Sequence, residues 1–550
     1  GNMNYAHYTS NYSAAGEGTS GDTGNMFAFT RIAPIYPLFL RDANRNIMFN
    51  KDANIPAYDY GDDKEGLGLE RPYLGKSNAL SDNLVNMDYN EGNTLNAVGT
   101  AEIRFLKDFT FRSVNSVYLD EYRGQFTTNP WFGLYKTDNG HIGVSHGRTW
   151  SYNLQQVLTW KHKFDLHEVD LMAGHEYYRN TGTSLSGNKS NMFSNNYPEL
   201  SGAVVTKSTT SSSSLYNTEG WFGRVNYSYA NKYFGEMSYR RDATSVFHPD
   251  HRWGTFWSVG ASWRINQEDF LKDVKAIQNL KLRVSYGVQG NDYLYLPGSS
   301  VRAYTPYTDL SAISSTGTES IYGPAYKGNK EITWEKNNNL DIGLEFSFWK
   351  GVIAGEFDFF TRRTSDMLFN LPIPSTTGFS TMPVNFGNMR NTGFEFNLSS
   401  NVYNDEHINV NLGVNGVTYK NKITKLPEKF REDGISSGWR IMKEGGGIYD
   451  YYMVKSAGVN PENGEQLYWI WNYDNKQFEK VGGADYDSGM KNRQYVGSSL
   501  PKLAGGFYVN AAAYGFDFSM QFAYRIGGKV YDANYANLMS AGNPGTNWHK

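Results

Sequence analysis

The sequence predicts an all-β protein: a large antiparallel transmembrane β-barrel with long extracellular loops and short periplasmic turns. Three observations support this prediction. Apolar and polar residues alternate along most of the 550-residue chain, and the connections between these alternating segments are in turn short and long. Aromatic residues also gather beside the short connections. Taken together, they place the apolar face of the predicted sheet against lipid.

The segment 280–288 shows the alternation most clearly. It reads LKLRVSYGV, in which every even-numbered residue is apolar and every odd-numbered residue is polar or glycine. A period of two is the mark of a strand with one apolar and one polar face. We therefore expect the even-numbered side chains to face lipid, and Lys281, Arg283 and Gln289 to face the lumen. The segment 221–239 repeats the pattern on both sides of a turn at Asn231-Lys232.

The same pattern predicts about fourteen strands, most of them roughly ten to thirteen residues long, which suits a tilted crossing of a bilayer. Strands of soluble proteins are usually shorter, about five or six residues. The predicted strands are 94–106, 108–120, 149–162, 167–179, 219–231, 233–242, 255–265, 279–289, 338–349, 351–363, 391–401, 407–419, 503–514 and 516–526.

The connections between the predicted strands differ in length. Short ones fall at 107–108, 163–166, 231–232, 350–351 and 514–515, and long ones at 121–148, 180–218, 290–337, 364–390 and 420–502. Short turns at one end and long loops at the other are typical of an outer-membrane barrel. The aromatic residues beside the turns are expected to form a girdle at the membrane surface; they are Trp160, Tyr229, Tyr233, Phe234, Phe348, Trp349, Tyr514 and Phe516.

The chain divides into a loop-rich segment, 1–93, and the strands and loops of 94–550. The first segment is interpreted as a long extracellular loop of the same barrel domain. A short helix capped by Asn266 or Gln267 is expected within 266–278, and a flexible loop in the Ser/Thr-rich tract 206–214. The first residues do not resemble a signal peptide, so we expect the sequence to be an internal part of a longer chain.

Composition narrows the class of function. Mean hydropathy is −0.58, and no apolar run is long enough for a membrane-spanning helix. A barrel remains compatible with this value because only alternate residues face lipid. The net charge of −3 argues against a nucleic-acid partner. The chain has no cysteine, so disulfides and thiol chemistry are excluded from it.

Several segments, in order along the chain, resemble SusC/RagA-type TonB-dependent transporters of Bacteroidetes. The run 223–270 matches the family pattern GR-x-x-Y-x-Y, R-D-x-S-S-x-F, R-W-G-x-F and E-x-F, with Thr244-Ser245 in place of Ser-Ser and Trp257 in place of the usual proline. The other matching segments are NLKLRVSYGVQGN (279–291), ITWEKNNNLDIGLEF (332–346), TRRTSDMLFNLPIPSTTGF (361–379), FGNMRNTGFEFNL (386–398), GVNPENGEQLYW (458–469) and VGSSLPKLAGGF (496–507).

The resemblance implies about fourteen of the family's twenty-two strands. It also implies that the signal peptide, the N-terminal domain, the plug and the last strands lie outside this sequence. The expected activity is TonB-dependent active import of a large nutrient, most often an oligosaccharide and sometimes a peptide, across the outer membrane. The expected partners are a SusD-like surface lipoprotein, the TonB complex acting through segments outside this sequence, and outer-membrane lipid.

Aromatic side chains in the predicted loops are the candidate ligand contacts, because aromatic faces pack against sugar rings. They are Trp131, Tyr135, Tyr293, Tyr304, Trp439, Trp469 and Trp471. The same residues could instead pack among themselves to stabilise the loops. We find no motif for a catalytic site, a cofactor or a metal, and therefore expect no enzyme activity.

Two alternative functions remain open from the sequence. One is a secreted soluble β-rich protein that binds or cleaves glycans. In such a protein the apolar face of the sheet would pack into a core. The other is a passive porin or an adhesin barrel. Extraction behaviour separates the first alternative from a membrane barrel, and the presence of a plug and a TonB box in the full-length gene separates the second.

Overall fold

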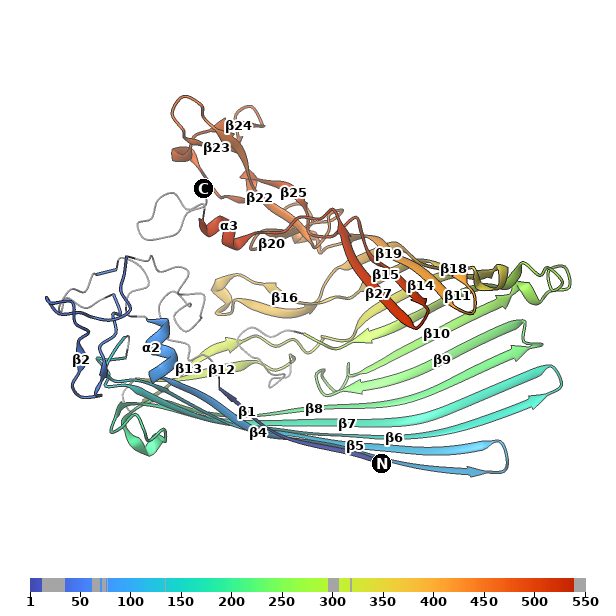
Figure 1. Ribbon diagram of the computed structural model, residues 1–550, viewed down its shortest axis with the longest axis horizontal. Helices are drawn as coiled ribbons and strands as arrows, with labels where there is room; N and C mark the ends of the chain where they lie inside the picture. Colours follow the sequence, from blue (N-terminus) through green and yellow to red (C-terminus); the bar gives the residue numbers. More distant parts are fainter. Residues whose placement is uncertain are drawn as a thin grey trace.

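The centre of the molecule is one antiparallel sheet of 15 strands that curves into a trough (Figure 1). This computed structural model describes the chain except for residues 12–34, 62–69, 72–75, 77, 134, 295–305, 317–318 and 539–550. Strand order in the sheet follows chain order. The strands are β1 (Asn2–Asn11), β4 (Met87–Phe105), β5 (Phe109–Thr128), β6 (His141–Phe164), β7 (His167–Met192), β8 (Ala203–Tyr229), β9 (Tyr233–Thr244), β10 (Trp253–Arg264), β11 (Ile277–Asn291), β14 (Glu335–Phe348), β15 (Ile353–Ser365), β18 (Asn388–Asn404), β19 (Ile408–Lys425), β26 (Leu503–Ala513) and β27 (Phe516–Ile526).

The predicted fold class is confirmed, and each of the fourteen predicted strands overlaps one strand of this sheet. One strand was missed. The segment before residue 94 was predicted to be loop, whereas β1 pairs with β4 from Asn2↔Val98 to Asn11↔Tyr89. The reason is that β1 carries only a short apolar series, Met3 and Tyr5, among polar neighbours. A weak alternation of this kind is hard to distinguish from loop sequence.

Each of the five long predicted loops contains paired strands, and two of them are largely extensions of the central sheet, so the prediction of loop was wrong for these portions. β5 and β6 stay paired from Phe109↔Trp160 to Thr128↔His141, and β7 and β8 are 26 and 27 residues long. The tract 206–214 is therefore strand rather than flexible loop. Hydroxyl pairs cross this hairpin, with 2.7 Å between Ser184 Oγ and Ser212 Oγ. Such pairs stabilise a sheet without apolar alternation, which is why hydropathy did not reveal them.

All the short turns lie at one end of the sheet, the right-hand end of Figure 1 for β4 to β9. Along this end the aromatic rings form a series of contacts. Phe105 stacks on Phe109 with ring centroids 5.5 Å apart, and Phe109 lies 6.5 Å from Trp160. Farther along the same series, Tyr229 stacks on Tyr233 at 6.4 Å. The series is the arrangement expected of a girdle of rings at a membrane surface.

The predicted helix within 266–278 is absent; the structure has a single 3-10 turn, η2 (Ile265–Gln267), followed by hydrogen-bonded turns. Asn266 does not cap a helix. Its side-chain amide donates to the Gln278 carbonyl at 2.9 Å, and its side-chain oxygen accepts from the Leu280 N–H at 3.2 Å. Asn266 thus holds the connection against the start of β11.

The opposite end of the sheet carries the longer connections, which fold into small sheets of their own (Figure 1). Buried clusters pack beneath them, for example Phe247, Ile332 and Trp334, and separately Phe386, Ile423 and Leu426. The elements at this end are β2 (Phe49–Asn50), β3 (Ile55–Pro56), α2 (Ala79–Val85), β12 (Leu310–Thr316), β13 (Glu319–Tyr326), β16 (Leu368–Pro372), β17 (Thr381–Asn385), β20 (Ile435–Ser437), β21 (Arg440–Met442), β22 (Asp450–Val459), β23 (Gln466–Asn472), β24 (Gln477–Val481), β25 (Arg493–Ser498) and α3 (Ala533–Leu538).

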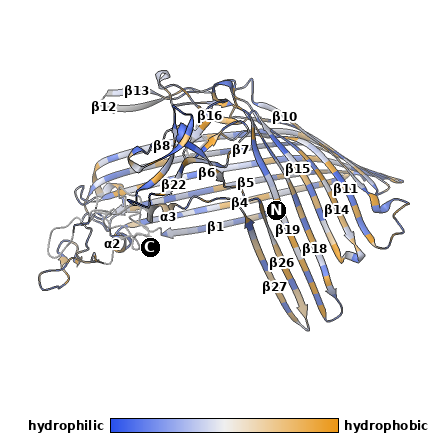
Figure 2. Ribbon diagram, turned by 90° about the horizontal axis from the view of Figure 1, so that it is seen from above, coloured by the Kyte–Doolittle hydropathy of each residue, from blue (hydrophilic) through white to orange (hydrophobic). Residues whose placement is uncertain are grey.

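Strand register keeps the apolar residues of neighbouring strands on one face. Val284 of β11 lies opposite Ala261 on one side and Ile342 on the other, and Ile342 lies opposite Phe359. Figure 2 shows the alternation of hydrophobic and hydrophilic residues along β18, β19, β26 and β27. None of the helices in the described part of the chain combines the length and apolarity needed to span a membrane.

Candidate functional site

The polar face of the sheet is the candidate functional surface. It borders a hollow of about 980 Å³ against β8 to β11, whose lining includes Arg240, Asp242 and Arg283. Alternation places these residues on the face opposite the apolar one, since Arg283 sits between Leu282 and Val284. Three groups of charged and polar side chains on this face each span strands that the sequence alone did not bring together.

The first group centres on Arg240 of β9. Its guanidinium donates to both carboxylate oxygens of Asp242, at 2.7 and 2.9 Å, and to Glu176 of β7 at 2.9 Å. Glu176 also accepts from the Asn153 amide of β6 at 3.0 Å. A Cβ on Gly220, between them on β8, would overlap Asp242 and Arg240. In this arrangement the Asp242 carboxylate and the Arg240 guanidinium occupy the space that a Cβ at this position would fill.

The second group centres on Arg283 of β11. Its guanidinium lies 2.6 Å from Asp358 and 3.4 Å from Glu356, both on β15, and 3.2 Å from Glu345 on β14. Asp358 is buried, while Arg283 and Glu356 are about a third exposed. The intervening Gly343 leaves the space, because a Cβ there would overlap both Arg283 and Asp358. Arg283 thus pairs with three carboxylates, and one of them, Glu345, also lies 3.5 Å from the Lys281 ammonium.

The third group is a row of amide and hydroxyl side chains together with one arginine. Ser238 and Ser258 hydroxyl oxygens lie 2.6 Å apart, and the Asn421 amide donates to Asn391 at 2.7 Å. Between these pairs, Arg362 donates to Asn339 at 2.8 Å. Register joins the row, since Asn339 lies opposite Arg362, and Arg362 opposite Asn391. We refer to these six residues as the amide ladder.

The loop end contains a buried acid–phenol pair outside the sheet. The Tyr60 hydroxyl donates to Asp82 of α2 at 2.7 Å. Burial raises the pKa of Asp82 from 3.8 to about 6, and burial together with the Asp82 carboxylate raises the pKa of Tyr60. Asn78 caps α2 by accepting from the Ser81 N–H at 3.2 Å. The pair fixes α2 against the cluster of Tyr58, Tyr60 and Phe132.

Charge pairs and amides of this kind have the hydrogen-bonding groups that a polar solute requires. Among the described residues, no group of three histidine, cysteine or carboxylate side chains could hold a metal ion. His248 and His251, which have a metal-like spacing, instead lie 3.3 Å from Asp250 and Glu331, respectively.

The structure divides the predicted loop aromatics between separate loops. Trp131 packs at the edge of the cluster around Tyr58 and Phe132, and the Tyr135 ring lies 4.0 Å from that of His141. Tyr293 is exposed beyond the end of β11. Tyr304 lies outside the described residues.

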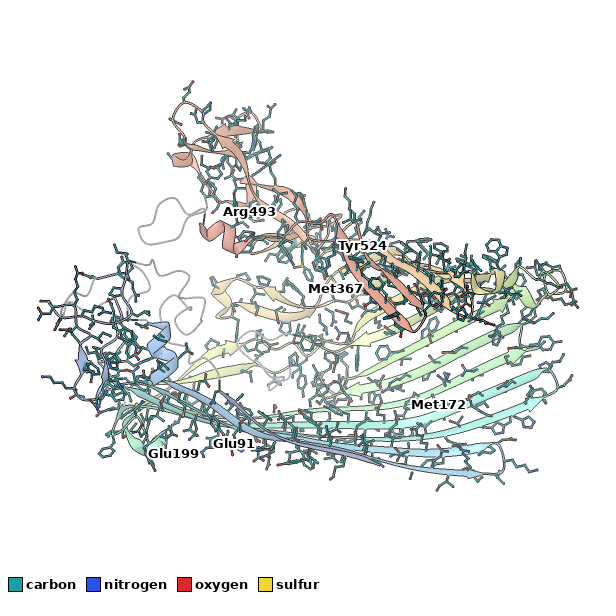
Figure 3. The ribbon with its side chains drawn as sticks, in the orientation of Figure 1. Glu91, Met172, Glu199, Met367, Arg493 and Tyr524 are labelled. Carbon is teal, nitrogen blue, oxygen red and sulfur yellow. The ribbon has the colours of Figure 1, made fainter. Side chains whose placement is uncertain are left out.

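The three predicted tryptophans of the region 435–498 lie in or beside its small sheets. The Trp439 ring is half exposed and lies 3.8 Å from that of Tyr531. Trp469 stands 5.3 Å beneath the Lys480 ammonium, and Trp471 meets Phe478 edge-on at 5.1 Å. Figure 3 labels Arg493 in this region and Glu199 at the far left end of the sheet, well away from it. Tyr135, Trp469 and Trp471 therefore have ring or cation partners near them in the sequence, whereas the partner of Trp439 lies in the segment that follows β27.

Most of the residues that form the polar groups were not predicted from the sequence. Alternation predicts that Arg283 lies on the polar face, but the acids around Arg283 come from β14 and β15 and do not follow from alternation. The ladder asparagines drew no attention because single amides are common in strands. Alternation along β15 could have identified the polar residues of that strand, because Glu356, Asp358 and Arg362 are all even-numbered. The apolar residues of this strand that face lipid are odd-numbered.

The family model described as "TonB dependent receptor-like, beta-barrel" matches residues 11–542. The TonB-dependent receptor P3 of Formosa agariphila is 26% identical over 521 residues, which are 90% of this chain and 49% of that protein. The TonB-dependent receptor SusC of Bacteroides thetaiotaomicron is 32% identical over 346 residues, which are 58% of this chain and 33% of that protein. The chain spans about half the length of the first of these relatives and a third of the second.

Among solved structures, the RagAB peptide importer in its open-open state matches with a TM-score of 0.75 at 22% identity, covering 92% of this chain and 52% of the matched one. The RagAB peptide transporter matches with a TM-score of 0.73 at 22% identity, covering 88% and 51%. At this level of identity the likeness concerns the fold.

Proposed function

The chain belongs to the TonB-dependent receptor-like β-barrel family, and from this membership we propose that the protein containing it imports a large nutrient actively. The barrel lies in the outer membrane, with its apolar parity against lipid. The observation that carries the proposal is the two-faced sheet itself. One face is apolar, and the other holds the charge groups of Arg240 and Arg283 and the amide ladder.

Energy for import comes from the TonB complex, and a SusD-like lipoprotein covers the loop end. Both partners are proposals from the relatives, since SusC and the RagAB assembly are the named proteins that this chain resembles. The polar face then serves as the wall of a gated passage. No bond chemistry is proposed for it, and the named relatives are receptors and transporters rather than enzymes.

An oligosaccharide is the favoured cargo. The hydrogen-bond donors and acceptors of the amide ladder are uncharged, except for the Arg362 guanidinium. Uncharged donors and acceptors suit the hydroxyl groups of sugars. The partly exposed loop aromatics, Trp439 above all, offer faces for sugar rings. Trp131, Tyr135, Tyr293, Tyr304, Trp469 and Trp471 complete the proposed set of contacts.

A peptide is the second candidate, and the charge groups favour it. Arg240 and Arg283 stand beside carboxylates on the same face, so the wall presents both signs of charge to a zwitterionic chain.

The test is uptake by cells that carry or lack the full-length gene. We expect deletion to abolish growth on one class of nutrient, oligosaccharide or peptide, and complementation to restore it. Inactivation of TonB should have the same effect while the barrel remains in the outer membrane. Uptake that persists without TonB would instead identify a passive pore. Growth that never depends on the gene would contradict the import function.

A further inference from the structure

The apolar face of the sheet ends, on four adjacent strands, in a group of positive charges. On these strands every second side chain faces outward, and Ile342, Phe359 and Phe394 belong to this outward-facing set, or parity. These three residues lie opposite one another in register. On this parity, β14, β15, β18 and β19 carry five basic residues and no acidic one. We call the five residues the basic patch: Lys336, Arg363, Arg390, Lys420 and Lys422, all of them exposed. The acids of β14 and β15, Glu345 and Asp358 among them, point to the other face.

The basic patch lies at one depth, beyond the loop-side edge of the apolar residues. Arg363 follows the first residue of β15, Ile353, by ten positions. At about 3.3 Å per residue and a strand tilt of about 40°, ten residues rise about 25 Å, which is the height of the lipid-facing band of a barrel. Trp349 and the short turn mark the lower edge of the band. The patch therefore lies at the headgroup level of the outer leaflet.

Three of the charges lie directly opposite one another. Arg363 pairs in register with Arg390, and Arg390 with Lys422. Like charges opposite one another destabilise a sheet, because their Cβ atoms are only about 5 Å apart. Within the described part of the chain, none of the five residues of the patch forms an ion pair. An anion bound among them would offset this repulsion.

A surface hollow of about 580 Å³ opens between these strands and the loop beyond β19. Arg363, Arg390, Lys425 and Arg431 line it. Its one acidic residue, Glu444, is engaged by Arg431 at 3.4 Å. The hollow thus offers an anion a concave, positively charged seat that is continuous with the apolar band below.

We propose that the basic patch binds the phosphate-bearing headgroup of an outer-leaflet glycolipid. A lipid fits better than a soluble anion because the patch continues into Phe359 and Phe394 on the same parity, against which acyl chains would lie. Clusters of Lys and Arg at the edge of a membrane-spanning region recognise anionic headgroups. This binding concerns the outer surface of the barrel and does not depend on import through it.

The experiment uses the full-length protein, delipidated in detergent and then given a bisphosphorylated glycolipid or its dephosphorylated form. Lipid retained after gel filtration is measured by mass spectrometry. The test variant combines Arg363→Gln, Arg390→Gln and Lys422→Gln. The control variant removes three exposed charges beside the short turns through Lys107→Gln, Lys163→Gln and Lys350→Gln. Migration on gels before and after boiling verifies that both variants fold.

We expect the wild type and the control variant to retain the phosphorylated lipid equally, and the test variant to retain at least tenfold less. The dephosphorylated lipid should be retained weakly by all three proteins. Equal retention by the test variant and the wild type would overturn the proposal, as would equal retention of both lipids by the wild type. Displacement of the lipid by millimolar inorganic phosphate would overturn the lipid assignment and leave an anion site only.

Discussion

Arg283 shows how much a single residue does on the polar face. Among the described residues, it is the one guanidinium within ion-pair distance of Glu345, Glu356 and Asp358, and the Lys281 ammonium is a second cation beside Glu345. Alternation in the sequence predicts its face, but its partners lie 62, 73 and 75 positions away and follow only from the register of β11, β14 and β15. Side-chain networks of this kind are therefore the part of the site that a single sequence predicts least.

Arg283→Gln should destabilise the barrel because Glu356 and Asp358 then lose their counter-charge, while Glu345 keeps the Lys281 ammonium at 3.5 Å. The expected loss is about 1–2 kcal/mol, reduced from the value for a fully buried pair because Arg283 is a third exposed. Urea unfolding of the protein in lipid vesicles measures it. Asp358→Asn on the Arg283→Gln background should cost less than on the wild type, since the two side chains interact directly. Strictly additive losses would show that they do not.

Asp82 provides a pH-dependent residue outside the membrane. Its pKa in the folded protein, about 6, lies above the value of 3.8 that an exposed aspartate has in the unfolded chain. The folded state therefore holds the proton more tightly, and local stability is highest below about pH 4, falls as the pH rises toward 6 and is constant above. The total change is about 2–3 kcal/mol.

Hydrogen exchange of the amides in 78–86 at pH 4.5 and 7.5, corrected for the intrinsic rates, should show greater protection at the lower pH. Asp82→Asn should remove most of this difference. The exposed Asp52→Asn serves as the control and should leave it in place. A difference that survives in Asp82→Asn would assign the pH dependence to another group.

At the scale of elements, strand prediction succeeded wherever one face meets lipid and failed where neither face does. All fourteen strands with a strong apolar parity are present. β1 and the upper halves of β7 and β8 were missed, because they are held by backbone pairing and by hydroxyl contacts such as Ser186 to Thr210 at 2.8 Å. A polar two-faced strand has the composition of a loop, so hydropathy alone cannot separate the two.

β11 offers a paired test of which face meets lipid. Val284→Arg places a charge beside Ala261 and Ile342 on the apolar face and should cost about 2–4 kcal/mol near the midplane. Ser285→Arg adds the same side chain one position along, on the polar face, and should cost less than about 1 kcal/mol. Urea titrations of folding into vesicles measure both. Equal costs would contradict the assignment of the two faces.

At the scale of the whole molecule, short turns at one end and folded loops at the other define a direction across the membrane. The sequence predicted this asymmetry from the lengths of the connections, and the sheet order confirms that consecutive strands are neighbours throughout. The loop substructures were beyond prediction. Their aromatics pack in local pairs, such as Trp471 with Phe478, whose partners depend on the small sheets β23 and β24.

The absence of cysteine from this chain allows that direction to be measured with single introduced thiols. Asn463→Cys lies in an exposed turn at the loop end, and Lys350→Cys in an exposed turn between β14 and β15. In intact cells a membrane-impermeant maleimide should label Asn463→Cys, because the loops face outward, and should label Lys350→Cys only after the outer membrane is permeabilised. The reverse result would invert the barrel. Equal labelling of both thiols in intact cells would mean that no membrane separates the two ends, as expected for a soluble sheet protein.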